Sequence, residues 1–269
     1  MRLAGSRCLV IGGARRLGRR LALDLAADGA AVCISSRGQD AALQDAVPAL
    51  ERAGAASAAA VRGDVTTARA AAALVTAAAE ALGGLDIVVF AASGPFVPQR
   101  PEALDEAAWD ASFDTIAKGF FFAACAAHGV FVGGLAPAEE GRAGAPARDA
   151  AAPAGAARGV VVAITDYLGL QPWAAFAAHG AAKAAQIHLV KELARAWAND
   201  GVRVCGVAPG PVDLEDDEHR AATLRAAAKT ESERLVTPQQ VVAAVRLCIE
   251  NEGMTGINVV VDAGSLLSS

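Results

Sequence analysis

The segment Gly12–Gly18 has the residue types and the spacing that bind a phosphate group. It reads Gly-Gly-Ala-Arg-Arg-Leu-Gly and lies between an apolar run and a helical pattern. Glycines allow a sharp turn and let a pyrophosphate approach bare backbone, while the following helix start offers free N–H groups and a partial positive charge. Because both flanking patterns fit, the segment predicts a dinucleotide site. The predicted contacts are Gly12, Arg15, Arg16, Leu17 and Gly18.

The second apolar run ends in Ser35-Ser36-Arg37. An enzyme that prefers NAD usually has an acid here, which binds the ribose 2′-hydroxyl. A guanidinium and hydroxyl groups suit a 2′-phosphate instead. The sequence therefore predicts NADP(H) rather than NAD(H) as the cofactor, with Ser36 and Arg37 as ligands. Asp64 and Val65 follow the third apolar run and are predicted to meet the adenine ring.

Strand-length apolar runs alternate with helical patterns along the whole chain, and these elements must position the site. The predicted strands are Arg7–Gly12, Ala31–Ser35, Ala58–Val61, Asp86–Phe90, Gly159–Thr165, Val202–Val207 and Asn258–Val261. The predicted helices are Leu17–Asp28, Gln39–Ala53, Thr67–Leu82, Leu104–Ala127, Ala174–Asn199, Glu218–Lys229 and Pro238–Glu250. This alternation predicts an α/β fold with a single Rossmann-type, doubly wound parallel sheet flanked by helices on both faces. No break in composition divides the chain, so residues 1–269 are predicted to form one dinucleotide-binding domain.

Two segments depart from the alternation. Residues 136–158 are rich in Ala, Gly and Pro and are interpreted as a surface insertion. Residues 212–238 carry an acidic cluster followed by an amphipathic pattern. Because they follow the sixth strand at the ligand-binding edge of the sheet, they are predicted to form a substrate lid. An ordinary solvated helix is the alternative interpretation.

Composition excludes several classes of protein. Hydrophobic residues make up 54% of the 269 residues, which argues against disorder. The net charge of −5 and the lack of a long basic run argue against binding to nucleic acid or to an anionic membrane. Five widely spaced cysteines predict a reduced cytoplasm, and no spacing indicates a metal site. The uncharged segment Gly119–Ala138 is long enough to span a bilayer, but its first part is interpreted as a helix buried in the fold or at a subunit contact.

Further motifs resemble those of the short-chain dehydrogenase/reductase family over nearly the whole chain. Besides Gly12–Gly18 and Asp64-Val65, they are Lys183 on a long helix, Ala208-Pro209-Gly210, and Thr255-Gly256 with Val261-Asp262-Ala263-Gly264. Arg16, Thr165-Asp166 and Gln171-Pro172 are similar to the pteridine reductase and dihydromonapterin reductase branch. The resemblance implies a homotetramer or homodimer. It also implies cofactor contacts at Ala92, Lys183, Pro209, Gly210 and Val212.

The positions that carry chemistry in this family differ here. The family's tyrosine, four residues before the lysine, falls on His179, and its serine falls on Asp166. Its asparagine position is Ile116, and its Asn-Asn-Ala-Gly motif reads Phe90-Ala91-Ala92-Ser93. We expect Asp166, His179 and Lys183 to carry proton transfer, because an imidazole can donate or accept a proton near neutral pH.

Three interpretations of His179 stay open. It is the general acid/base of a reductase, or it supports a non-redox step such as cyclisation, dehydration or isomerisation, or it is a relic in a protein that only binds cofactor or partner. Asp166 could orient the imidazole, act as the acid itself, or bond only to nearby backbone. The residues predicted to line the substrate pocket are Ser93, Phe96, Tyr167, Trp173 and Phe176. Aromatic residues here favour a flat or bulky apolar substrate, although they could also simply fill the core. The function predicted is an NADP(H)-dependent oxidoreductase that reduces a carbonyl, C=N or C=C group of a cyclic small molecule.

Overall fold

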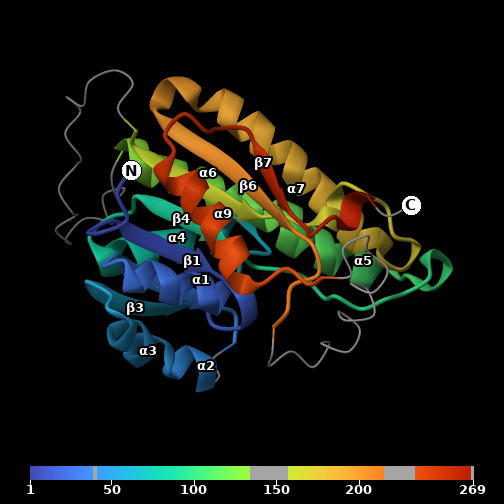
Figure 1. Cartoon of the computed structure of the whole chain (residues 1–269), viewed down its shortest axis with the longest axis horizontal. Helices are drawn as coiled ribbons and strands as arrows, with labels where there is room; N and C mark the ends of the chain where they lie inside the picture. Colours follow the sequence, from blue (N-terminus) through green and yellow to red (C-terminus); the bar gives the residue numbers. More distant parts are fainter. Residues whose placement is uncertain (39–40, 134–156, 215–233, 268–269) are drawn as a thin grey trace.

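One parallel sheet organises the structure. The computed structural model describes residues 1–38, 41–133, 157–214 and 234–267 (Figure 1). In these residues seven strands pair in the order β3-β2-β1-β4-β5-β6-β7. The strands are β1 (Arg7–Ile11), β2 (Ala31–Ser36), β3 (Ser57–Arg62), β4 (Ile87–Phe90), β5 (Gly159–Ile164), β6 (Val202–Pro209) and β7 (Asn258–Val261). Each predicted strand is present, and the predicted doubly wound fold is confirmed.

The strands are continuously apolar because both faces of the sheet are covered. In β1, Cys8 and Val10 belong to one buried cluster, whereas Leu9 and Ile11 belong to the other. Helices α1, α3 and α9 cover the first face, and α4, α6 and α7 cover the second (Figure 1). The helices are α1 (Arg16–Ala27), α2 (Ala41–Gln44), α3 (Ala46–Ala53), α4 (Ala68–Leu82), α5 (Glu106–Phe113), α6 (Gly119–Gly133), α7 (Ala177–Ala196) and α9 (Pro238–Glu250).

Three predicted helix ranges needed correction. The single helix predicted over Gln39–Ala53 is two helices, α2 and α3. Pro48 has no N–H and its ring would clash with the preceding turn of a continuous helix, so the chain restarts just before it. The predicted helix Ala174–Asn199 is shorter, because the 3-10 turns η4 (Ala174–Phe176) and η5 (Ala198–Asp200) form its ends.

The third correction concerns Leu104–Ala127. The helix begins at Glu106, where the Asp105 side chain accepts a bond from the N–H of Ala108, and it continues to Gly133 through a π-helical turn, η2 (Asp114–Lys118). The stretch Glu106–Gly133 is long and apolar enough to cross a membrane, with half of its most apolar window buried. The rings of Phe120 and Phe90 meet edge to face at 5.6 Å. These contacts fit the interpretation of a helix buried in the fold.

Three expectations lie mostly outside the described residues. The predicted helix Glu218–Lys229 and nearly all of the predicted insertion at 136–158 fall there. Of the predicted lid at 212–238, the described ends meet each other, because Val212 and Val236 form a parallel bridge.

A buried arginine fastens α9 to the sheet. Arg203 lies on β6 and is 7% exposed. Its guanidinium donates to the carbonyl oxygens of Cys248 at 2.6 Å, Ile249 at 2.6 Å and Met254 at 2.9 Å. These carbonyls lie in or just beyond the last turn of α9, where a helix leaves acceptors without partners. Arg203, on β6, therefore supplies hydrogen-bond donors to carbonyl groups at the carboxyl end of α9.

Candidate active site

The turn after β1 is shaped for close approach of a ligand backbone. Gly12 has φ 79°, and a Cβ there would lie 2.8 Å from the backbone nitrogen of Ala92. A Cβ at Gly18 would overlap the carbonyl oxygen of Gly12. At the start of α1 the N-cap residue Arg15 makes no side-chain cap bond. A pyrophosphate fits this cradle, because Gly12 and Gly18 place no Cβ there and the helix N-terminus favours an anion.

The carboxyl ends of β2 and β3 bring cations together. Ser36 lies beside Arg62 in the strand register, and the Arg62 guanidinium donates to the carbonyl oxygen of Arg37 at 3.3 Å. Both arginines are exposed, so their charges are available to an anion at this edge. The sequence analysis missed Arg62, and its place as the last residue of β3 was the signal.

Asp64 and Val65 follow β3 as predicted, but their side chains face the protein. The N–H groups of Val65 and Thr66 donate to the Asp64 carboxylate at 2.7 Å and 3.1 Å. Burial opposes ionisation, yet these bonds and the charge of Arg37 hold the pKa of Asp64 below its usual value. Val65 is buried beside Gly119. An adenine ring would therefore meet mainly the backbone of these two residues.

The loops after β4 and β6 reach the same edge. Ala92 contacts the turn at Gly12, and the exposed Ser93 follows it. Beyond β6, the N–H of Gly210 donates to the carbonyl oxygen of Val261 at 2.9 Å. This bond places Pro209, Gly210 and Val212 at the carboxyl ends of the strands, where open parallel sheets bind ligands.

Asp166 and His179 form a pair at the end of β5. Asp166 caps the 3-10 turn η3 (Tyr167–Gly169), with its Oδ1 accepting from the N–H of Leu168 at 2.9 Å. Its Oδ2 lies 3.3 Å from Nε2 of His179, in the first turn of α7. Lys183 is one turn further along α7, and its Nζ donates to the carbonyl oxygen of Ile164 at 2.7 Å. The spacing of four residues puts His179 and Lys183 on one helix face, so the predicted trio is assembled.

The electrostatics of the trio follow from burial. Lys183 is 3% exposed. Burial lowers its pKa from 10.5 to about 8, although the charge of Asp166 opposes the change. Burial also raises the pKa of Tyr167, and the charges of Asp166 and Asp262 add to the effect. At neutral pH the phenol of Tyr167 is therefore neutral, while Lys183 remains mostly charged and close to its titration range.

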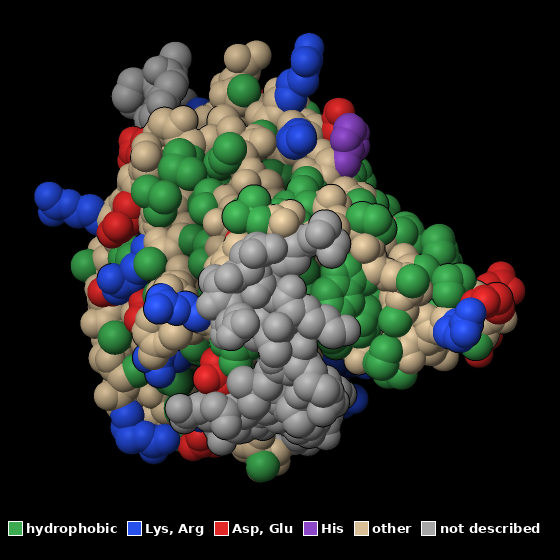
Figure 2. Space-filling view, turned by 45° about the vertical axis from the view of Figure 1, so that its right-hand side comes forward, with side chains coloured by type: hydrophobic (Ala, Val, Ile, Leu, Met, Phe, Trp, Pro, Cys, Tyr) green, Lys and Arg blue, Asp and Glu red, His purple; other side chains and the backbone are tan. Residues whose placement is uncertain are grey.

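An aromatic wall stands beside His179. Phe96, in the loop after β4, stacks on Phe176 with ring centroids 4.4 Å apart. It also meets the imidazole of His179 edge to face at 5.0 Å. Trp173 contacts Tyr167 at 6.1 Å and Phe176 at 6.4 Å. The predicted aromatic pocket residues are thus in one group. Figure 2 shows hydrophobic side chains gathered on the face of the molecule that is turned forward there.

The loop after β4 is fastened to this wall. The N–H of Gln99 donates to the carbonyl oxygen of Ala175 in η4 at 2.8 Å. A small cavity of about 30 Å³ lies behind, with Leu104, Ser112 and His179 among its lining residues. It has room for about one water molecule.

The asparagine position of the family is dry here. Ile116 is fully buried in the π-helical turn η2, and Phe90 is 1% exposed. Neither residue can donate or accept a hydrogen bond through its side chain. Proton exchange with solvent must therefore use another polar group of the site.

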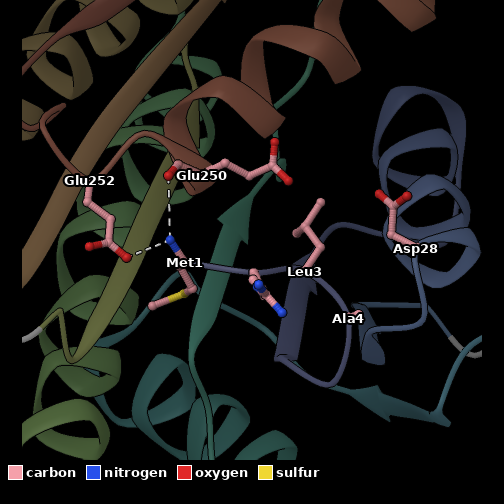
Figure 3. A pocket seen from close by; sticks show the side chains of 7 residues that line it. Met1, Leu3, Ala4, Asp28, Glu250 and Glu252 are labelled. Carbon is pink, nitrogen blue, oxygen red and sulfur yellow. Dashed lines mark hydrogen bonds and ion pairs between the residues drawn. The ribbon is translucent and has the colours of Figure 1, made fainter.

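A larger surface hollow lies at the opposite end of the sheet. It has a volume of about 610 Å³, and Met1, Leu3, Asp28, Glu250 and Glu252 line it (Figure 3). The amine of Met1 lies 2.7 Å from the carboxylate of Glu252. This hollow is at the amino end of β1, away from the edge that carries Asp166 and His179, so we do not assign the site to it.

Comparison with known proteins decides the family. Residues 6–135 match the family model described as short chain dehydrogenase, and residues 146–265 match the one described as enoyl-(acyl carrier protein) reductase. A curated relative, 3beta-hydroxysteroid dehydrogenase 1 of Eggerthella lenta, is 30% identical over 98% of this chain and 95% of its own. The chain belongs to the short-chain dehydrogenase/reductase family. As a member of this family, it is an oxidoreductase.

Other members similar to this short-chain dehydrogenase/reductase include cis-4-hydroxycyclohexanecarboxylate dehydrogenase of Sinomonas cyclohexanicum, 32% identical over 95% of this chain and 94% of its own. Among solved structures, a putative short-chain alcohol dehydrogenase from Sinorhizobium meliloti is 29% identical, with a TM-score of 0.82 over 99% of this chain and 98% of its own. A short-chain dehydrogenase from Burkholderia cenocepacia, in complex with NADP, is 27% identical, with a TM-score of 0.80 over 99% of this chain and all of its own.

Proposed function

We propose that this enzyme is an NADP(H)-dependent oxidoreductase that interconverts an alcohol and a carbonyl on a cyclic small molecule, or reduces a C=N or C=C bond in such a ring. The observation that carries the proposal is the Asp166–His179 pair, 3.3 Å apart beside Lys183. The pair lies at the same sheet edge as the phosphate cradle. A proton-exchanging pair next to a dinucleotide is the arrangement that hydride transfer to an oxygen-bearing carbon needs.

The residues that would hold the cofactor fit NADP(H). Backbone at Gly12 and Gly18 would receive the pyrophosphate, with Arg15, Arg16 and Leu17 at the helix start. Ser36, Arg37 and the neighbouring Arg62 would receive the 2′-phosphate, for which two guanidinium groups are well suited. Bound NADPH supplies a hydride. Lys183 would hold the nicotinamide ribose, and the Asp166–His179 pair as a unit would exchange the proton with the substrate oxygen.

A cyclic substrate is supported from two sides. Two relatives are named as dehydrogenases of a hydroxysteroid and of a hydroxycyclohexanecarboxylate, and both of these substrates carry their hydroxyl group on a ring. In this chain the stacked rings of Phe96 and Phe176 offer a flat apolar surface beside His179. Flat surfaces of this kind gain free energy from burying an alicyclic ring.

A non-redox step on such a ring is the second candidate. It is favoured by one observation, the complete burial of Ile116 where the family has a polar side chain that leads protons outward. The pteridine reductase-like branch also remains a prediction, which rests on Arg16 and Asp166. We further propose a cytoplasmic homodimer or homotetramer.

The test measures NADPH absorbance with cyclohexanones, 3-oxosteroids and dihydropterins, and NADP⁺ reduction with the corresponding cyclic alcohols. We expect turnover in strict proportion to cofactor with at least one ring class. Tight NADPH binding without any turnover would refute the proposal. A ring compound isomerised or dehydrated without cofactor consumption would establish the second candidate. The variant Lys183→Met is the control in the same assays, because any turnover that it retains does not depend on the candidate active site.

A further inference from the structure

We infer that Asp166 is the catalytic residue that touches the substrate oxygen, and that His179 is a positioning residue that acts through Asp166. This inference rests on the proposed function. It reverses the order that the family pattern suggests, in which the residue four positions before the lysine meets the substrate.

Exposure separates the two side chains. Asp166 keeps 23% of its side chain accessible, whereas His179 keeps 5%. An imidazole is shorter than the phenol of the family's tyrosine, so its nitrogens lie closer to the helix. Phe96 packs edge to face against the ring and covers it from the loop side. The carboxylate is therefore the member of the pair that a substrate can reach.

The two imidazole nitrogens have different surroundings. Nε2 faces Oδ2 of Asp166, whereas Nδ1 is buried and has no hydrogen-bond partner among the described residues. A proton on Nε2 has the Asp166 carboxylate as its acceptor, whereas a proton on Nδ1 would have no acceptor among the described residues. The neutral ring therefore carries its proton on Nε2 and donates it to Asp166. Its basic atom, Nδ1, is walled off from any substrate.

The carboxylate of Asp166 is held by two donors. Leu168 N–H binds Oδ1 and the imidazole binds Oδ2. Each carboxylate oxygen can accept a second bond, so the group can still receive the hydroxyl of a substrate. The two donors fix the orientation of the carboxylate, and its remaining acceptor positions are where the O–H of an alcohol would donate to a general base.

Oxidation of the alcohol sends a hydride and a proton to different acceptors. The hydrogen on the alcohol carbon leaves with its bonding electrons to NADP⁺, the O–H proton passes to Asp166, and the C=O bond forms. The half-buried carboxyl, 23% accessible, then releases the proton to water. In reduction the protonated carboxyl of Asp166 returns a proton to the substrate oxygen. Lys183 and Tyr167 are the titratable groups on which the charge of Asp166 acts, and Asp262 also acts on Tyr167.

The first test compares Asp166→Asn, His179→Gln and His179→Leu in the oxidation of cyclohexanol and of a 3β-hydroxysteroid by NADP⁺. We expect D166N to lower kcat about 10³-fold, within the usual range for loss of a general base. Gln keeps an N–H donor at the reach of Nε2, so H179Q should stay within about tenfold of wild type. H179L lacks the donor that holds Oδ2, so its kcat should fall below that of H179Q, and the recovery given by Gln reports the positioning role of the imidazole. Unchanged affinity for NADP⁺, measured by calorimetry, is the control for folding. Wild-type kcat in D166N, or a loss in H179Q as large as that in D166N, overturns the inference.

The second test does not need turnover. Nitrogen NMR of histidine-labelled protein with NADP⁺ bound reports which ring nitrogen carries the proton, and the His179 signal is identified by its loss in H179Q. We expect protonation at Nε2 and a change of that signal in D166N. A proton on Nδ1 overturns the inference. If neither cyclohexanol nor the steroid is oxidised, the proposed function is refuted for these two substrates. The NMR measurement still shows whether Nε2 of His179 donates its proton to Asp166.

Discussion

Replacing Lys183 by Met should change how stability depends on pH. Nζ of Lys183 is bonded to the carbonyl oxygen of Ile164 inside the fold, and burial lowers its pKa from 10.5 to about 8. Between these two pH values the unfolded chain binds more protons than the folded one. The contribution of Lys183 to the free energy of unfolding therefore rises with pH across this window.

The size of the effect follows from the two pKa values. At about 1.4 kcal/mol per pH unit, the gap between 10.5 and about 8 corresponds to about 3 kcal/mol. Below pH 8 the folded protein bears this whole cost of burying an ammonium group, and above pH 10.5 it bears none. Methionine has a similar shape and no charge, so Lys183→Met removes the dependence together with the bond to Ile164.

Urea unfolding of both proteins without cofactor, at about pH 7.5 and about pH 10, measures the difference. The free energy of unfolding of wild type relative to Lys183→Met should rise by about 2 kcal/mol between these conditions. The buried thiols of Cys8 and Cys33, whose pKa burial raises to about 12, also titrate at high pH. Both proteins share these thiols, so their effect cancels. A wild-type-to-variant difference that stays constant with pH would refute the reasoning.

Three further perturbations test the cofactor site and the frame. Arg37→Glu should weaken NADPH binding relative to NADH binding by about 10- to 100-fold, because it replaces a charge-assisted bond to the 2′-phosphate by repulsion. Calorimetry with both cofactors measures this ratio of affinities. The control variant Arg195→Glu, on the exposed face of α7, should leave the ratio unchanged. Gly18→Val should abolish detectable NADPH binding, since its side chain would overlap the Gly12 carbonyl; a variant that binds NADPH normally would contradict the cradle geometry. Arg203→Leu leaves several carbonyls at the end of α9 unpaired, each at about 1–3 kcal/mol, so we expect a loss of about 3–5 kcal/mol in urea unfolding, against about 0.5 kcal/mol or less for Arg195→Leu.

The sheet could be predicted from sequence because buried parallel strands are continuously apolar. All seven runs were placed, whereas their order in the sheet was seen only in the structure. Helix ends were harder, since Pro48 and the 3-10 turns around α7 respond to local backbone constraints rather than to periodicity. The resemblance to the family implied that Asp166 and His179 share one site, because they fall on its serine and tyrosine positions.

Relative burial within the site could not be predicted. Whether Asp166 or His179 is more exposed depends on how Phe96 packs, and Phe96 comes from a different loop. Arg62 was missed because its position beside Ser36 depends on the register between β2 and β3, which was not predicted. Sequence periodicity assigns a face to a residue but does not specify which loop will cover it.

The close approach of Gly12 to Ala92 has a consequence for binding equilibria. The loop that begins at Ala92 is also fastened to η4 through the bond from Gln99 to Ala175, one step from the aromatic wall at His179. Cofactor and substrate would therefore contact opposite ends of one short segment, from Ala92 to Gln99. If binding of the nucleotide orders this segment, the ring compound then binds without the free-energy cost of ordering it. Linkage makes the effect reciprocal, so each ligand should tighten the other by the same factor.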